Sequence, residues 1–342
     1  MHIPDGYLSP QTTIPAFAAM IPIWAVAFKK VKLSLGHKRI PTLALCAAFS
    51  FVIMMFNIPV AGSSAHAVGA VFIAILIGPW AAVISITVAL LIQAIVFGDG
   101  GIMPFAINCI NMAFVMPFTG YFLYKLIAGQ SPLGSKRNLA ATFIGSYAGL
   151  NISAILASIE FGIQPIFFKA ANGTPLFCPY PLSISMPAMI FSHSLIAGPI
   201  EGIITVAAIA YIIKFAPHIM NKGSEILVSP ATEPIYKKYK AILIAFAVLI
   251  ILTPLGLIAT GTAWGEWGTD EIKQSIGFIP NGLNSLSDKW HAILPDYSLP
   301  TLGDGQFGAT LGYILSAIIG IVLIIGLTLI SSKIIMKSHK KK

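Results

Sequence analysis

Long apolar runs, separated by short polar stretches, restrict the fold of this chain more than any other feature of its sequence. Only 10% of the 342 residues are charged and 56% are hydrophobic, whereas about a quarter of the residues in a soluble domain are charged. In water such a chain would expose large apolar patches, but lipid tails solvate the same surface in a bilayer. The sequence therefore predicts an all-α polytopic membrane protein.

Nine apolar stretches are candidate transmembrane segments. The two stretches on either side of Gly78-Pro79 are short, because about 20 residues are needed to cross the hydrocarbon unless a helix is tilted or sheltered by protein. The predicted segments cover residues 12–29, 41–57, 66–78, 80–97, 104–127, 139–160, 186–213, 241–260 and 309–335.

Lysine and arginine fall almost entirely in alternate connections between these segments, and this asymmetry predicts the orientation. With the N-terminus outside and the C-terminus in the cytoplasm, only Lys169, Lys273 and Lys289 of the 21 basic residues face outward. Orientation in the bilayer thus accounts for the net charge of +9. We expect a multi-pass plasma membrane protein without a nucleic-acid partner.

A polar, basic stretch that contains Pro230 and Pro234 divides the chain, and we expect it to link two membrane modules on the cytoplasmic side. The second module is a helix pair around a long external loop. Trp264, Trp267 and Trp290 in this loop favour a position at the membrane surface. The predicted parts are a membrane domain over residues 1–216, the linker over 217–240, and the two-helix module over 241–342 with its loop at about 261–308.

The first six residues, Met1-His2-Ile3-Pro4-Asp5-Gly6, place an imidazole one residue after the amino group expected at Met1. The amine, the amide nitrogen of His2 and its Nδ1 can occupy three positions of a square plane, which suits Ni²⁺ or Cu²⁺ more than Zn²⁺. Pro4 and Gly6 favour a turn that directs the terminus back into the bundle. The alternative is that His2 is only a polar residue at a disordered terminus.

A histidine that opens the third segment, His66, is a candidate for the fourth planar position. It ends a run of small residues that also contains Ser63 and Ser64. Ionisable groups inside a membrane are functional candidates. The alternative is a histidine whose ring is satisfied by backbone carbonyls within the bundle.

Other polar residues within or next to apolar segments are candidates for orienting the ligands or for a part in translocation. Asp99 lies in a glycine-rich turn and is a possible ligand-orienting acceptor, a helix cap or a solvated acid. Asn108 and Asn111 either orient a ligand or form hydrogen bonds between helices. His193 and Glu201 are eight residues apart, near one face of a helix, and form either a structural pair or part of the transport cycle.

These motifs, in this order, resemble the CbiM/NikM family, the substrate-binding components of energy-coupling-factor (ECF) transporters for cobalt and nickel. The resemblance covers about residues 1–215, and the second module is similar to the accessory NikN/CbiN-like component. Its most specific parts are Met1 to Gly6, Pro59 to His66, Gly78-Pro79-Trp80, and Phe97 to Gly101 with Asn108 and Asn111.

The resemblance implies a helix bundle that holds one Ni²⁺ or Co²⁺ ion through Met1, His2 and His66, with the metal as transported substrate. It also implies a location in a prokaryotic cell membrane and a role in supplying nickel, or cobalt for cobalamin biosynthesis. No Gly-x-x-x-x-Gly-Lys-[Ser/Thr] phosphate loop occurs in the sequence. ATP hydrolysis is therefore expected of partners, namely a pair of ECF ATPase subunits and a transmembrane coupling subunit.

Two alternatives belong to other functional classes. Glu201 is the best argument for a gradient-driven metal permease, although no internal repeat of the kind common in such carriers is found. An intramembrane metalloenzyme is less favoured, because neither His66 nor His193 begins the H-E-x-x-H pattern that puts two metal ligands and a base on one helix. The residues leave the choice between nickel and cobalt open, as both metals accept imidazole.

Overall fold

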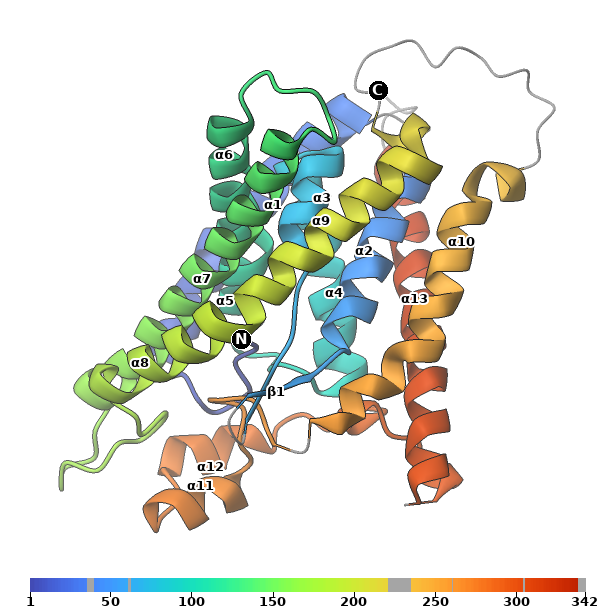
Figure 1. Cartoon of the computed structure of the whole chain (residues 1–342). Coiled ribbons are helices and arrows are strands. Elements are labelled where there is room, and N and C mark those ends of the chain that lie inside the picture. The colour runs from blue at the N-terminus through green and yellow to red at the C-terminus, as the bar shows by residue number, and fades with distance from the viewer. Residues whose placement is uncertain (36–39, 61–62, 221–234, 260, 304, 338–342) are drawn as a thin grey trace.

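Helices make up most of the structure, a computed structural model that describes residues 1–35, 40–60, 63–220, 235–259, 261–303 and 305–337. The long helices run side by side, and two short helices lie across one end of the bundle (Figure 1). The α-helices are α1 (Pro10–Leu35), α2 (Ile40–Met54), α3 (Ala70–Ile77), α4 (Pro79–Ile92), α5 (Phe105–Asn108), α6 (Met116–Ala128), α7 (Lys136–Phe167), α8 (Leu182–Ser192), α9 (Gly198–Phe215), α10 (Ile235–Leu252), α11 (Thr269–Ile276), α12 (Asn281–Ser287) and α13 (Gln306–Lys337).

Seven helices of the described part are long and apolar enough to cross a membrane, namely Pro10–Leu33, Pro79–Phe97, Phe105–Ala128, Lys136–Phe167, Leu182–Phe215, Tyr239–Ile258 and Gln306–Ser331. Of the remaining predicted segments, 41–57 contains α2 with 15 residues and 66–78 contains α3 with eight. At 1.5 Å per residue α3 is about 12 Å long, far short of the roughly 30 Å hydrocarbon core. The count of nine segments and the orientation of the termini stay predictions.

The first four residues of the predicted segment 66–78 are not helical, and a short hairpin precedes them. Strands β1 (Ile58–Val60) and β2 (Ser63–Ala65) form an antiparallel hairpin, a small departure from the predicted all-α fold. Residues 66–68 then lie in neither a helix nor a strand. Gly69, with φ 75°, is the N-cap residue of α3. Gly78, with φ 99°, ends α3, and Pro79 starts α4, because proline suits the first turn of a helix. The chain therefore enters the bundle at residue 66 and reverses inside it.

Three π-helical turns interrupt the described spanning helices, and each lies beside a predicted site residue. They are η2 (Gln93–Phe97), η3 (Cys109–Val115) and η4 (His193–Ala197). Such turns widen a helix locally and are frequent at functional sites. In this bundle they precede Asp99, follow Asn108 and begin at His193, respectively.

Glycine allows the closest helix contact in the bundle, between α6 and α7. A Cβ atom on Gly120 would lie 2.7 Å from the carbonyl oxygen of Gly145, and one on Gly149 would lie 2.8 Å from that of Met116. Gly145 and Gly149 are spaced as in the small-xxx-small pattern of membrane helix pairs. The backbones of α6 and α7 therefore pack directly against each other.

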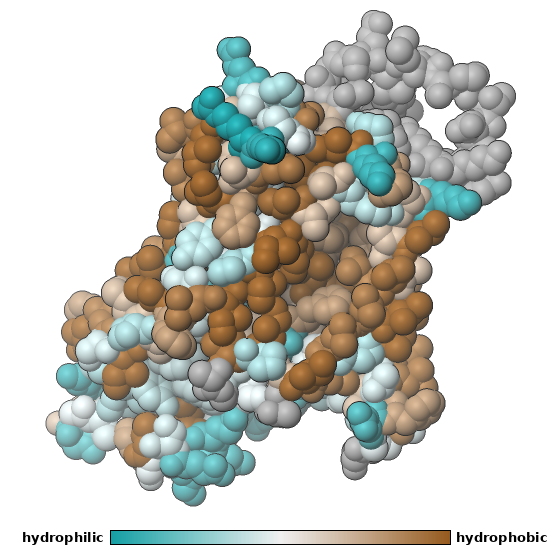
Figure 2. All heavy atoms as spheres, viewed as in Figure 1, coloured by the Kyte–Doolittle hydropathy of each residue, from teal (hydrophilic) through white to brown (hydrophobic). Residues whose placement is uncertain are grey.

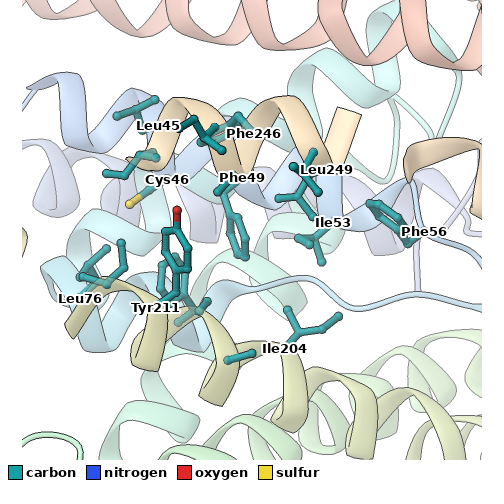
Figure 3. Close-up of a pocket in the computed structure, with 18 of the residues that line it drawn as sticks. Leu45, Cys46, Phe49, Ile53, Phe56, Leu76, Ile204, Tyr211, Phe246 and Leu249 are labelled. Carbon is teal, nitrogen blue, oxygen red and sulfur yellow. The ribbon is translucent and has the colours of Figure 1, made fainter. Parts of the chain in front are cut away.

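An apolar groove of about 760 Å³ separates the first module from α10. Its walls come from α2, α3, α9 and α10, with Phe49, Ile204, Tyr211 and Leu249 among the side chains that face it (Figure 3). Hydrophobic residues also cover the flanks of the molecule between more polar ends, as the space-filling view shows (Figure 2). This distribution suits a protein surrounded by lipid.

The predicted external loop is folded and packs on the bundle. In its described residues 261–303 it contains α11, α12 and the 3₁₀ turns η7 (Pro295–Tyr297) and η8 (Pro300–Leu302), and we call it the α10–α13 loop. Trp264 packs against Phe161 and Trp267 against Tyr180, with ring centroids 5.7 and 5.6 Å apart. These two tryptophans therefore have protein partners, and the position of the loop at the membrane surface stays a prediction.

Much of the predicted linker cannot be compared with the structure. Residues 221–234 lie outside the described residues, and so do Lys38, Arg39 and the terminal Lys340, Lys341 and Lys342. Before that stretch the chain ends α9 and forms the short 3₁₀ turn η5 (Pro217–Ile219), and after it α10 begins. A further 3₁₀ turn, η6 (Thr253–Ile258), extends α10 toward the α10–α13 loop.

Candidate metal centre

The N-terminal residues are buried inside the protein and held by backbone hydrogen bonds. Met1, His2 and Ile3 are 5%, 1% and 0% exposed. The Ile3 amide donates to Asn108 Oδ1 at 2.9 Å, and Asn108 Nδ2 donates back to the Ile3 carbonyl at 3.1 Å. Gly101 N–H donates to the same carbonyl at 2.9 Å. This segment is therefore fixed in place, which disfavours the interpretation of His2 as a residue of a disordered terminus.

A tight turn at Asp5 and Gly6 fixes the direction of this segment. The Asp5 carboxylate accepts hydrogen bonds from the backbone of Ile102 at 3.0 Å and of Met103 at 2.8 Å. Burial raises the pKa of Asp5, although these two backbone donors act in the opposite direction. Gly6 has φ 86°, and a Cβ there would lie 2.6 Å from the carbonyl oxygen of Leu283 in α12, so only glycine fits.

Two imidazole rings meet next to the amino group. His66 Nε2 lies 3.2 Å from His2 Nδ1, and the ring centroids are 4.9 Å apart at an angle of 29°. The other ring nitrogen of His66 lies 3.1 Å from the Ala67 carbonyl, which orients the ring. Burial, with the nearby His2 and amino terminus, lowers the pKa of His66 to about 3. The ring is thus neutral near pH 7, the form in which imidazole binds metals.

Two carboxylates border the same nitrogens. Asp99 Oδ1 lies 3.0 Å from His2 Nδ1, and the Met1 amine donates to Glu266 Oε1 at 3.0 Å. One ligand atom from each of His2, Asp99 and Glu266 falls within 4.8 Å of the others, an arrangement able to hold a metal ion. The amine, two imidazoles and two carboxylates therefore converge at one place.

Two side chains donate hydrogen bonds to the Asp99 carboxylate. Tyr297 donates to its carboxylate at 2.5 Å and Gln93 Nε2 at 2.9 Å. Burial by itself would raise the pKa of Asp99, but the charge and hydrogen bond of His2 lower it below its usual value. Asp99 is consequently ionised and can attract a cation.

The α10–α13 loop covers this cluster. Besides Glu266 and Tyr297, it supplies Trp267, whose carbonyl accepts from the Tyr7 hydroxyl at 2.8 Å, and Leu294, whose amide donates to Val96 at 2.7 Å. Ser63 Oγ donates to the carbonyl of Thr262 at 2.9 Å. A cavity of about 440 Å³ beside the cluster is lined by Ser64, His66, Asp99, Glu266 and Tyr297, among others. Both modules thus enclose the candidate site.

The remaining predicted residues lie elsewhere in the bundle. Asn111 donates to Glu160 at 2.7 Å, and His193 Nδ1 bonds the carbonyl of Met189 in its own helix at 2.8 Å. Glu201 accepts from the backbone of the segment that follows His66. His193 and Glu201 therefore have separate partners, and the structure does not bring Asn111, His193 or Glu201 to the nitrogen cluster.

Two known families match this chain. Residues 2–219 match the family CbiM, described as a cobalt uptake substrate-specific transmembrane region. The chain belongs to the CbiM family. Residues 238–337 match a second family, the PDGLE domain, so the chain joins a CbiM region and a PDGLE domain.

Relatives of this CbiM chain are named as metal transport proteins. It is 44% identical, over 95% of both chains, to the fused nickel transport protein NikMN of Rhodobacter capsulatus. It is 29% identical to the cobalt transport protein CbiM of Ruminiclostridium cellulolyticum, over 63% of this chain and 84% of that protein. These relatives and its seven long apolar helices identify this CbiM chain as a multi-pass protein of a prokaryotic plasma membrane and of a nickel and cobalt transport family.

The fold of the CbiM region is also known from crystals. A truncated transition metal transporter of known structure is 48% identical to this chain and superimposes with a TM-score of 0.59, covering 62% of this chain and 98% of that one. The similarity extends over the larger of the two modules.

Proposed function

We propose that this protein captures Ni²⁺ or Co²⁺ outside the cell and mediates its uptake as the substrate-binding component of an ECF-type transporter. The ion is held by the Met1 amine, the amide nitrogen and Nδ1 of His2, and Nε2 of His66. The observation that carries the proposal is the distance of 3.2 Å between His2 Nδ1 and His66 Nε2 in a buried site.

This distance is close to what a square of nitrogen ligands requires. Metal–nitrogen bonds of about 2.0 Å place neighbouring ligands of a square about 2.8 Å apart, so a small contraction would bring both imidazoles onto one ion. The nearby carboxylates of Asp99 and Glu266 add negative charge, which favours a divalent cation in this buried place. The ion is the cargo of the protein and stays bound only until it is released inward.

Topology and partners complete the proposal. The chain has nine membrane segments with the metal site at the outer end, a linker over residues 217–240, and the accessory module over 241–342. The cavity beside the cluster serves as the entrance for the ion. Because the sequence has no phosphate-binding loop, a pair of ECF ATPases and a transmembrane coupling subunit supply the energy, and this chain is not an enzyme.

The first test is metal binding by detergent-purified protein. Ni²⁺ and Co²⁺ are titrated by calorimetry and absorption spectroscopy into wild type, His2→Ala and His66→Ala. We expect a one-to-one Ni²⁺ complex with the absorption of a planar nitrogen site, lost in both variants, and the two titrations rank the metals. His193→Ala is the matched control, since it removes a buried histidine whose Nδ1 bonds the Met189 carbonyl of its own helix. Binding that is indifferent to His2 and His66 would refute the proposed site.

A further inference from the structure

A carboxylate in the middle of the bundle contacts the backbone that carries His66. Glu201 lies in the first turn of α9 and is 0% exposed. Its Oε2 accepts from Val68 N–H at 2.7 Å and its two oxygens accept from Gly69 N–H at 3.0 and 3.1 Å. In the described part of the chain it takes part in no ion pair. A buried carboxyl group needs hydrogen-bond donors, and these two backbone amides supply them.

The segment that Glu201 holds is also fixed from its other side. Ser50 of α2 donates to the Val68 carbonyl at 2.6 Å. Gly69 has φ 75°, and a Cβ there would lie 3.1 Å from the ring of Phe49. Ala67 and Val68 lie in neither a helix nor a strand, and Gly69 is the N-cap of α3, so the bonds from Glu201 and Ser50 help to set the path of this segment. The position of the His66 imidazole follows from that path, because His66 is only two residues from Val68.

The helix that carries Glu201 borders a groove on its other flank, and one hydrogen bond crosses that groove, from the Tyr211 hydroxyl to the Ala241 carbonyl of α10 at 2.7 Å. Ile204, Ala208 and Tyr211 of α9 line the apolar groove of about 760 Å³ that separates α9 from α10 (Figure 3). Beside Ile204 and Ala208 the groove leaves α9 room to shift without overlapping packed side chains, once the bond of Tyr211 to Ala241 breaks or moves with it. A shift of α9 would draw Glu201 away from the amides of Val68 and Gly69.

We propose that Glu201 is a positioning residue of the metal site, and that its bonds to Val68 and Gly69 make retention of the metal depend on the position of α9. The inference rests on the proposed function, since it requires His66 to bind the ion. With α9 in the observed place, the carboxylate keeps His66 against His2. When α9 moves, the peptide after His66 is released and the fourth nitrogen leaves the ion. Glu201 thus connects a spanning helix to the metal without touching it.

The test compares the rate at which Ni²⁺ leaves Glu201→Gln and wild type after addition of excess chelator, followed by absorption. The side-chain oxygen of glutamine can accept from one of the two backbone amides. Its NH₂ group would face the other backbone N–H and cannot accept a hydrogen bond from it. Losing one hydrogen bond to a charged acceptor predicts dissociation about ten-fold faster or more. The spectrum and the one-to-one stoichiometry should stay unchanged, because all four nitrogens remain. Ser146→Ala, which removes a buried hydroxyl from α7, is the control and should dissociate like wild type.

Two further variants keep the outcomes distinct. Glu201→Asp retains the charge with a shorter reach, so it should show an intermediate dissociation rate and serves if Glu201→Gln does not fold. A purely structural role for Glu201 would lower the folded fraction but leave the dissociation rate of the folded protein unchanged. Wild-type rates in both Glu201 variants would overturn the inference. Retention of the planar Ni²⁺ spectrum by His66→Ala would instead overturn the proposed function.

Discussion

Replacing Gly101 by alanine tests whether the N-terminal segment must sit where the structure places it. A Cβ on Gly101 would overlap the backbone nitrogen of Asp5, and it would lie 2.7 Å from both Asp5 Oδ1 and Pro104 Cδ, whereas ordinary contact begins at 3.4 Å. The segment would have to retreat by more than half an ångström. Asp5 cannot do so freely, because its carboxylate is bonded to the amides of Ile102 and Met103.

The expected cost follows from this overlap. An extra methyl group in a packed site costs about 1–3 kcal/mol, which corresponds to a five- to 150-fold loss of affinity when the metal requires the displaced geometry. Calorimetric titration of Ni²⁺ into the variant measures it. Gly326→Ala is the control, because a Cβ at Gly326 meets nothing within 4 Å. Equal Ni²⁺ affinity in Gly101→Ala, Gly326→Ala and wild type would show that the N-terminal segment does not position the ligands.

Three further results are expected. Glu266→Gln leaves the buried Met1 amine without its counter-ion, and the loss of a charged hydrogen bond, about 1.5–3 kcal/mol, should lower the Tm of the metal-free protein by a few degrees. The Tm of the Ni²⁺-loaded protein should fall less, because the metal then binds the amine. An equal fall in both forms would contradict an amine-bound metal. Burial raises the pKa of Cys178 to about 12, so a membrane-impermeant maleimide should react slowly at pH 8 and faster as the pH rises. Rapid reaction at pH 8 would contradict the complete burial of this side chain. Ni²⁺ at about 100 times its Kd should add roughly 2.7 kcal/mol of stability, lost on chelation, and an unchanged Tm would argue against binding to the folded state.

The sequence could predict those features that depend on neighbouring residues. The membrane class, the turn at Pro4 to Gly6 and the candidate pair His2 and His66 follow from composition and local motifs, although metal binding by these residues stays a prediction. The eight-residue length of α3 was not predicted, because hydropathy does not distinguish an extended buried stretch from a helix.

Contacts between distant residues could not be predicted. Glu266 and Tyr297 reach the N-terminal cluster across about two hundred residues or more, and nothing in the spacing of the sequence pairs them with Met1 and Asp99. Glu201 was recognisable as an unusual acid in an apolar helix, but its partners are backbone amides, which leave no trace in residue type. The tryptophans of the α10–α13 loop could not predict the contacts of Trp264 with Phe161 and of Trp267 with Tyr180, because aromatic residues suit a membrane surface and a protein interface equally.

The α10–α13 loop covers the candidate metal site from the same chain that builds the site, and this changes how strong its contacts need to be. A covalent tether turns docking of the loop into an intramolecular step with an effective concentration that reaches the millimolar range for short connections. The few hydrogen bonds of the loop and the ion pair of the partly exposed Glu266 with the Met1 amine can then keep the site covered most of the time, although each of these contacts is weak. Weak contacts also break quickly. If the proposed site binds metal, fusion of the two modules keeps a cover at every site whose individual contacts are weak enough to open for the next ion.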